Sequence, residues 1–355
     1  MKLFRKQYSQ PGTQPGVIHD EKKGELTLSL FDFNASQCVE KLNATAEQCA
    51  TFLDSNNETW AHVQGDPDKD TFTQLAKDFG IHELFIEDVS NLGQRPKIDI
   101  QEEQIFMILT LPVQTELGVS LQQISLFLMK NTVISFCGGK FNPFTTINNR
   151  LKLPTSRLRK RHIDFLFYSL IDTVIDWGFP VLEQYADRID ATEELLLENH
   201  DKDILQKIHL LRREVLLLRR QIWPHREMLN TLLRDDTSEL IESDTKLFLR
   251  DCYDHSISIL ELTETYHEMA NGLMELYMSV VSLKLNDVMR VLTIIATLFI
   301  PPTFVVGIYG MNFSRDAGPL NMPELYSPYG YLGVWAVMIF MIVGMLLFFK
   351  KHKWI

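Results

Sequence analysis

The chain has 355 residues, of which 45% are hydrophobic, and it carries a formal net charge of −11 at pH 7. A chain of this length can form two or three domains, and its acidic balance argues against nucleic acid as a partner, because phosphate backbones are bound by basic surfaces. The first residues, MKLFRKQYSQPGTQPG, contain no long apolar run, so a signal peptide is not expected.

Strand-like segments dominate the chain up to about residue 145. Five runs rich in β-branched and aromatic residues have the length of strands: Glu25–Phe33, Thr59–Val63, Gln104–Val113, Gln123–Lys130 and Thr132–Gly138. Little more than Asn131 separates the last two, which predicts a hairpin. Asp70–Gly80 and His82–Asn91 have ends typical of short helices. We therefore predict a cytosolic α/β domain over residues 1–156, with a compact sheet and helices on its faces.

Helical patterning replaces strand patterning after about Arg157. Apolar residues recur with a period of 3.6 residues from Leu158 to Asn230, with charged residues between them. Because proline and glycine disfavour the helix interior, we expect interruptions at Gly178–Pro180 and at Pro224. The sequence therefore predicts a second cytosolic part, residues 157–283, that is built from helices.

One very long helix is predicted from about Ser243 to Ile300 and onward into the first membrane span. No proline occurs between these residues, and only Gly272 weakens the helix propensity. At 1.5 Å per residue, such a helix extends roughly 90–100 Å. A helix of that length is not stable alone, so its apolar stripe must pack on neighbouring helices or on other subunits.

Two segments near the C-terminus are apolar enough to cross a membrane. No charged residue occurs from Val291 to Ser314 or from Gly330 to Phe349. Each run meets the length of roughly 20 residues that a hydrocarbon core requires. The resulting divisions are a first transmembrane helix at 284–313, an external loop at 314–330, a second transmembrane helix at 331–349 and a basic cytosolic tail at 350–355.

Basic residues set the expected orientation in the membrane. Lys284 and Arg290 precede the first span, and three lysines follow the second. Because basic flanks stay on the cytoplasmic side, both termini are expected in the cytoplasm. Residues 284–355 hold six Lys/Arg and three Asp/Glu, a net charge of +3, which leaves −14 for residues 1–283. An acidic cytosolic body of this kind fits a protein that meets cations.

Signals for catalysis are poor. The Gly-Gly-Lys within Cys137–Phe141 lacks the spacing and the following Ser/Thr of a phosphate-binding loop, and no metalloprotease, nucleophile-elbow or dinucleotide motif occurs. The four cysteines lie far apart, without a C-x-x-C pair, and are interpreted as reduced, packed thiols rather than zinc ligands. We therefore predict that the chain is not an enzyme.

Two carboxylate clusters could bind a cation. Asp251 and Asp254 share one face of the long helix, and His255 follows four residues after Asp251. Earlier in the chain, Glu87 stands beside Asp88. A solvated helix face with local pairing also explains such patterns. Binding of a hard cation stays open, because Mg²⁺ and Ca²⁺ take oxygen ligands.

The first span carries a narrow stripe of small or mildly polar residues. Alternating three- and four-residue steps connect its members: Asn286, Met289, Thr293, Ala296, Ile300, Thr303 and Gly307. Two interpretations stay open, since small residues let helices approach each other and such a stripe can also line a pore. No charged side chain lies in either span, so a proton relay is not expected. Two spans cannot enclose a pore, so a pore would require several copies.

The sequence around the two spans points to a family. YGMNF at Tyr309–Phe313 directly follows the first span, MPEL follows at Met322–Leu325, and KKHKWI closes the chain. Together with the acidic body and the long helix, this arrangement resembles the CorA family of magnesium transporters. The similarity extends over most of the chain, including EDVSNLGQRPK at Glu87–Lys97 and QIWPHRE at Gln221–Glu227.

The resemblance implies an architecture. Each chain would contribute an α/β cytosolic domain, long α-helices and two C-terminal transmembrane helices to a funnel-shaped homopentamer. The assembly would lie in the inner (plasma) membrane as a multi-pass protein, with its N- and C-termini in the cytoplasm. Its partners would be further copies of itself, the lipid bilayer and divalent cations.

The resemblance also implies which residues form the ion path. Gly310, Met311 and Asn312 would form the external selectivity filter, because neutral amide and backbone oxygens can hold hydrated Mg²⁺ through its waters. The pore and its gate would be lined by Asn286, Met289, Leu292, Ile300, Thr303 and Gly307. The large apolar members of this set would form a constriction that stops ions by dewetting. Glu324 in the external loop would concentrate cations by its charge.

The implied function is Mg²⁺ influx down the membrane potential, with Co²⁺ and Ni²⁺ as further candidate ions. Cytosolic Mg²⁺ would also bind between subunits through Glu87, Asp88, Asp172 and Asp251 and hold the pore closed, so Mg²⁺ would be both cargo and regulator. A zinc transporter of the same superfamily and a non-conducting, membrane-anchored metal sensor are the alternatives. The pair of GMN and MPEL segments favours Mg²⁺ over zinc.

Overall fold

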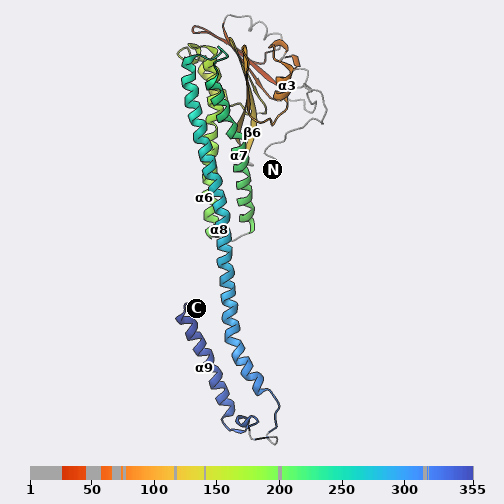
Figure 1. Cartoon of the computed structure of the whole chain (residues 1–355), viewed down its shortest axis with the longest axis vertical. Helices are drawn as coiled ribbons and strands as arrows, with labels where there is room; N and C mark the ends of the chain where they lie inside the picture. The colour runs from red at the N-terminus through yellow and green to blue at the C-terminus, as the bar shows by residue number, and fades with distance from the viewer. Residues whose placement is uncertain are drawn as a thin grey trace. The chain divides into compact units, whose positions relative to one another are not determined.

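The computed structural model describes residues 26–44, 57–65, 73–74, 77–115, 118–139, 141–198, 202–314, 318 and 320–354. The chain divides into two compact units, Met1–Leu273 and Met274–Ile355. Helix α8 (Ser243–Tyr309) begins in the first unit and ends in the second (Figure 1). The predicted helix Asp70–Gly80 falls partly outside the described residues.

A mixed sheet of seven strands forms the centre of the described part of the first unit. Its strands are β1 (Thr27–Phe33), β2 (Cys38–Lys41), β3 (Glu58–Gln64), β4 (Lys97–Ile100), β5 (Gln104–Thr115), β6 (Gly118–Met129) and β7 (Thr132–Cys137). The order across the sheet is β2-β1-β3-β7-β6-β5-β4. Strands β3 and β7 pair in parallel, and the other neighbours pair antiparallel. All five predicted strand segments are confirmed, as is the β6–β7 hairpin.

One face of the sheet packs against helix α3 (Glu83–Ser90). Because side chains alternate along a strand, every second residue points to this face. The ring of Phe106 lies 4.7 Å from the ring of Phe85 on α3 and 4.5 Å from the ring of Phe127, measured between centroids. The helix predicted over His82–Asn91 is therefore confirmed, and its apolar side explains why it packs on the sheet.

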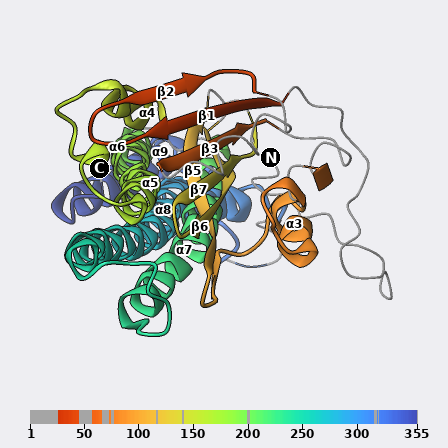
Figure 2. The same cartoon turned by 90° about the horizontal axis from the view of Figure 1, so that it is seen from above.

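The other face of the sheet is covered by the remaining described helices of the first unit (Figure 2). They are α4 (Thr145–Lys152), α5 (Ile163–Asp176), α6 (Gly178–Glu198), α7 (Lys202–Arg234) and the first part of α8. The predicted break at Gly178–Pro180 is confirmed, because α5 ends and α6 begins there. The predicted break at Pro224 is wrong: α7 continues through this buried proline. Packing of α7 on the sheet outweighs the loss of one backbone hydrogen bond.

Helix α8 has 67 residues, which corresponds to about 100 Å at the usual rise. It confirms the predicted continuous helix and extends it through Pro301 and Pro302 to Tyr309. After α8 come a short 3₁₀ turn, Pro323–Tyr326, and helix α9 (Gly330–Lys351).

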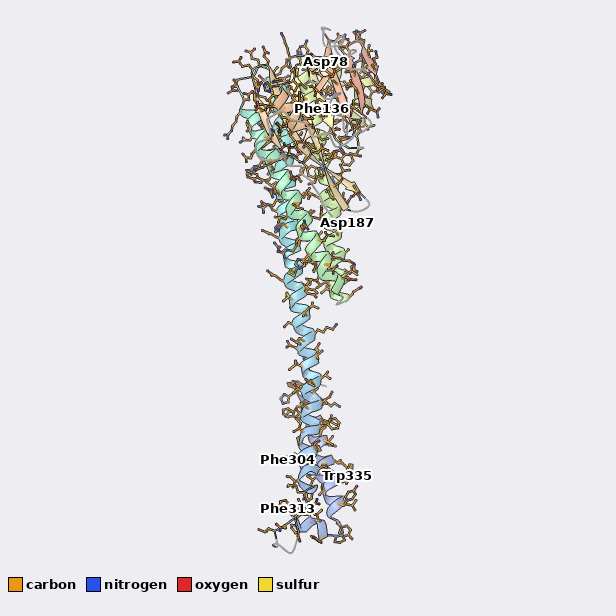
Figure 3. The ribbon with its side chains drawn as sticks, turned by 90° about the vertical axis from the view of Figure 1, so that its right-hand side faces the viewer. Asp78, Phe136, Asp187, Phe304, Phe313 and Trp335 are labelled. Atoms are coloured by element: carbon orange, nitrogen blue, oxygen red, sulfur yellow. The ribbon has the colours of Figure 1, made fainter. Side chains whose placement is uncertain are left out.

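Three described helical segments are long and apolar enough to cross a membrane: Ile163–Glu198, α8 and α9. In Ile163–Glu198, 61% of the apolar window is buried inside the structure, against 0% in α8 and 11% in α9. The first segment therefore finds its apolar partners within its own unit. The other two leave apolar side chains exposed, including Phe304 and Trp335, which project from α8 and α9 (Figure 3).

Candidate functional site

A group of three potential metal ligands lies between α5 and α8. Asp172 and Asp176 of α5 meet His255 of α8, and one ligand atom from each lies within 4.8 Å of the other two. The Nδ1 atom of His255 is 3.0 Å from the Oδ1 atom of Asp176. All three side chains are partly buried, so an ion could reach them from solvent while keeping some bound water.

The local fold brings these three residues together. A four-residue spacing places Asp172 and Asp176 one above the other on the same face of α5. The ring of Phe179 packs edge-on against the ring of His255, with centroids 5.8 Å apart. At Gly178 a side-chain carbon would lie 3.0 Å from Cδ1 of Ile259, so glycine permits the close approach of α8 to the α5–α6 junction.

The electrostatics of the group centre on Asp172. Burial, and after it the nearby charge of Asp176, raise the pKa of Asp172 to about 6, while His255 opposes this shift. Burial also raises the pKa of the Tyr168 hydroxyl, and the charge of Asp172 adds to that effect. Two carboxylates held close together in a partly desolvated place repel each other, and a cation between them would relieve the repulsion.

Asp251, the third carboxylate predicted for this region, lies close enough for its charge to raise the pKa of Asp172. It is exposed on α8, one turn before His255. The structure therefore brings the two predicted residues Asp172 and Asp251 near each other. Sequence reasoning missed the contribution of Asp176, although the four-residue spacing of two aspartates within SLIDTVID was a usable signal.

The other two predicted carboxylates, Glu87 and Asp88, lie on α3, on the opposite face of the sheet from α5 and α8 (Figure 2). The carboxylate of Asp88 is ion-paired with Lys97 and accepts a hydrogen bond of 3.2 Å from Nε2 of Gln94. Gln123 donates to the Asp88 carbonyl oxygen at 3.0 Å, which ties α3 to β6. Within one chain, the α3 carboxylates are not part of the Asp172 group.

The predicted pore positions all lie on α8 or directly after it. In the single chain the residues at positions 286, 289, 292, 300, 303 and 307 are all exposed. The large apolar members are among the more exposed, with Met289 at 52%, Leu292 at 57% and Ile300 at 65%. Apolar and small side chains that the chain itself leaves uncovered require another apolar neighbour, which can be lipid or further protein.

A compact turn ends α8 at the start of the GMN segment. The Gly310 N–H donates to the Val306 carbonyl at 2.8 Å, and the Met311 N–H donates to the Ile308 carbonyl at 3.1 Å. A side-chain carbon at Gly310 would lie 3.2 Å from that Val306 oxygen, so the turn leaves little room there. Asn312 follows outside the helix and is exposed.

A cavity of about 340 Å³ lies between the end of α8 and the start of α9. Its lining residues are Val305, Tyr309, Glu324, Ser327, Tyr329, Gly330, Gly333, Val334 and Val337. Glu324, the predicted cation-concentrating residue, therefore borders a partly polar hollow beside Tyr309. Thr303 and Gly307, the predicted pore positions in the same part of α8, do not line this cavity.

Sequence comparisons show that the chain is similar to known transport proteins. The family described as CorA-like Mg²⁺ transporter protein matches residues 55–351. The chain is 38% identical to the cobalt/magnesium transport protein CorA of Thermotoga maritima, over 100% of this chain and 99% of the relative. It is 23% identical to the protein of the same name from Methanocaldococcus jannaschii, over 82% of this chain and 89% of that one.

Comparisons with solved structures agree on the fold. The complete structure of the CorA magnesium transporter from Methanocaldococcus jannaschii matches with a TM-score of 0.77 and 21% identity, over 92% of this chain and 98% of that one. The ZntB cytoplasmic domain from Vibrio parahaemolyticus matches with a TM-score of 0.54 and 15% identity, over 70% of this chain and 96% of that domain. At these identities the likeness concerns the fold alone.

Proposed function

The chain belongs to the CorA family of Mg²⁺ transporter proteins, and on that premise we propose that it forms a homo-oligomeric membrane channel for Mg²⁺ influx. The observation that carries this proposal is the exposed stripe on α8, which leads directly into Gly310–Asn312. The named relatives transport cobalt as well as magnesium, and we extend Co²⁺ to this chain as a second cargo.

Oligomerisation follows from the number of apolar helices. The two C-terminal helices of one chain cannot enclose a pore. Several copies, each placing its α8 around a common axis, could do so, and the resemblance to the family implies five copies. The exposed positions Met289, Leu292 and Ile300 would then face that axis and form its apolar constriction. Asn286, Thr303 and Gly307 would give the remaining pore wall its small or polar character.

At the outer mouth, Asn312 of each copy would present an amide oxygen to the passing ion. Mg²⁺ loses its waters reluctantly, so neutral oxygens that bind it through water hold it weakly enough to let it leave. The tight turn at Gly310 lets the backbone bend toward the axis without a side chain in the way. Glu324 would raise the local concentration of cations outside.

Closure by cytosolic Mg²⁺ would occur between copies. Within one chain the sheet lies between Asp88 on α3 and Asp172 and Asp251 on the other face. An ion that joins these carboxylates must therefore join two chains, with Glu87 as a further ligand. Asp88 already pairs with Lys97, so bound Mg²⁺ would share or displace this pairing. Low cytosolic Mg²⁺ would empty the site, and the open state would gain population.

The membrane potential supplies the driving force. With both termini in the cytoplasm and the GMN turn outside, an inside-negative potential favours cation influx by about 2.3 kcal/mol per charge per 100 mV, or about 4.6 kcal/mol for Mg²⁺. The segment from Val291 to Ser314 contains no charged residue, so no charged side chain there would bind the ion tightly as it passes.

The test is Mg²⁺ uptake into proteoliposomes that contain a Mg²⁺-sensitive dye and are held at an inside-negative potential. Uptake should rise with the potential and stop when the lumen that faces the cytosolic unit is preloaded with millimolar Mg²⁺. Asp251→Asn should conduct despite this preload. Protein-free vesicles give the leak. Absent uptake from a correctly inserted oligomer would contradict the proposal, and uptake of Zn²⁺ without Mg²⁺ would point to zinc transport.

A further inference from the structure

We propose that the cavity between the end of α8 and the start of α9 binds a lipid with a primary-ammonium head group, that is, a lipid of the phosphatidylethanolamine type. The inference rests on the proposed function only in that α8 and α9 span the membrane. It concerns neither the ion path nor the cytosolic carboxylates, because all residues that line the cavity belong to the second unit.

Two helices and the loop between them supply the walls of this cavity. Val305 and Tyr309 lie four residues apart and therefore share one face of α8. Steps of three or four residues likewise place one set on a common face of α9: Gly330, Gly333, Val334 and Val337. The loop adds Glu324, Ser327 and Tyr329. The volume of about 340 Å³ falls within the range of roughly 300–1,000 Å³ that is usual for ligand pockets.

The cavity changes from polar to apolar along its length. Glu324, Ser327 and Tyr329 bring one carboxylate and two hydroxyl groups to the end near the loop. Val334 and Val337 follow about one and two turns into α9, so the apolar wall extends about 10 Å from the start of that helix. A polar end with acceptors and an apolar interior match the head group and the first acyl carbons of a lipid.

The charge of the cavity favours an ammonium group. Of the described residues that line it, Glu324 alone is formally charged, and its carboxylate forms no ion pair with any described residue. An ammonium N–H donates a charge-assisted hydrogen bond to a carboxylate. The rings of Tyr309 and Tyr329 add attraction for a cation that lies over a ring face. A purely anionic head group would be repelled by Glu324.

The same walls disfavour a hydrated metal ion. Mg²⁺ keeps several waters and is surrounded by oxygen ligands, whereas valine and glycine make up more than half of the lining residues. At Gly333 an added side-chain carbon would meet nothing within 4 Å, so free space remains beside α9. An acyl chain would fill this space and gain dispersion contacts with the valines.

A lipid in this cavity would contact α8, α9 and the loop at once. It would therefore stabilise the turn Pro323–Tyr326 against the ends of both helices. Because a ligand that binds only the folded state raises the apparent stability, phosphatidylethanolamine should raise the melting temperature of the wild-type oligomer in detergent. The same lipid should leave the melting temperature of Glu324→Gln unchanged.

Native mass spectrometry of the detergent-solubilised, full-length oligomer can count the bound lipids. Given equal amounts of phosphatidylethanolamine and phosphatidylglycerol with identical acyl chains, the wild type should prefer the ethanolamine lipid about tenfold, as one charge-assisted hydrogen bond implies. Glu324→Gln removes the charge and should abolish this preference. Val334→Phe fills the apolar part and should lower occupancy by both lipids. Glu275→Gln and Val343→Phe, at exposed positions outside the cavity, are the matched controls and should bind like the wild type.

Equal retention of the two lipids by the wild type, or an unchanged preference in an intact Glu324→Gln oligomer, would overturn the inference. Displacement of the lipid by an equal concentration of soluble glycerophosphoethanolamine would also contradict it, because the apolar wall would then contribute nothing. Lipid binding is measured without ion flux. A wild-type oligomer that takes up Mg²⁺ without any lipid preference refutes this inference alone, whereas a lipid-selective oligomer that conducts no Mg²⁺ refutes only the channel.

Discussion

A side-chain carbon at Gly330 would lie 1.9 Å from the carbonyl oxygen of Glu324. The Gly330 N–H also donates to the Ser327 carbonyl at 3.1 Å, so the first residue of α9 packs directly against the turn Pro323–Tyr326. The contact is with backbone, which cannot rotate away. Glycine is therefore required here to hold the turn that carries Glu324 against α9.

Replacing this glycine tests that requirement. Gly330→Ala should force the turn away from α9 and lower the free energy of unfolding by about 1–3 kcal/mol, as overpacking does. Gly333→Ala is the matched control on the same helix, because a side-chain carbon there meets nothing within 4 Å. Thermal unfolding in detergent measures both variants. Equal melting temperatures for the two would contradict the tight contact.

An ion pair between α6 and α7, in which Glu214 is buried and Arg188 is partly exposed, should contribute to the stability of the first unit. Oε2 of Glu214 accepts a hydrogen bond of 2.6 Å from Nη1 of Arg188, and the Glu214 side chain is only 1% exposed. Arg188→Ala would leave this carboxylate buried without its cation, which typically costs 3–5 kcal/mol. Denaturant unfolding with α-helix circular dichroism measures the change.

The pair of Arg219 and Glu264 provides the control. Its nitrogen–oxygen distance of 2.8 Å is similar, but both side chains are more than 40% exposed. Arg219→Ala should therefore cost no more than about 1 kcal/mol. A comparable loss in both arginine variants would show that burial does not set the strength of these pairs.

Acid should destabilise the first unit partly through His225. This buried ring accepts a hydrogen bond from the Thr110 N–H at 3.0 Å, and burial lowers its pKa to about 4. An unfolded histidine takes up a proton near pH 6.5, so the unfolded state binds more protons than the folded state between pH 6.5 and pH 4. Stability therefore falls with decreasing pH across this window, by about 1.4 kcal/mol per unit from this residue.

His225→Gln removes the titrating ring and should reduce the loss of stability between pH 6.5 and pH 5 by about 2 kcal/mol relative to wild type. The comparison of two proteins cancels the contributions of other groups, including Asp172, whose raised pKa acts in the opposite direction. The exposed His209 supplies the control His209→Gln, which should follow the wild-type curve. Parallel curves for wild type and His225→Gln would rule out this source of acid sensitivity.

Water should reach one side of α8 and lipid another. In a background without native cysteines, Met289→Cys and Thr303→Cys should react with a charged thiol reagent and lose Mg²⁺ uptake. Val291→Cys, which is off the stripe but equally exposed in the single chain, should stay unmodified. Uniform reactivity at all three positions would favour a stripe that does not line a pore.

Much of the fold followed from local patterns, and the exceptions have physical reasons. Strands β2 and β4 escaped prediction because each has only four residues, mixes polar and apolar side chains, and lies at an edge of the sheet. Proline at position 224 predicted a break that burial of α7 overrides. The parallel pairing of β3 with β7 joins strands that are distant in sequence, which no local pattern reveals.

Of the group Asp172, Asp176 and His255, only the two aspartates, which share one helix, could be predicted to lie together. The four-residue spacing of Asp172 and Asp176 is visible in the sequence. Their partner His255 is 79 residues from Asp176, so only the packing of α8 on α5 brings the ring to them. For the same reason, the sequence could not show that Glu87 and Asp88 lie on the opposite face of the sheet from Asp172.

The most direct test of the central claim is Mg²⁺ uptake by Asn312→Ala in proteoliposomes at an inside-negative potential, with the oligomer verified by light scattering. Asn321→Ala is the control in the same loop, because the Nδ2 atom of Asn321 donates a hydrogen bond of 2.9 Å to the Ser314 carbonyl within that loop. The proposal predicts at least a tenfold loss for Asn312→Ala and uptake within threefold of wild type for Asn321→Ala. Wild-type uptake by an intact Asn312→Ala oligomer would contradict a filter at this position.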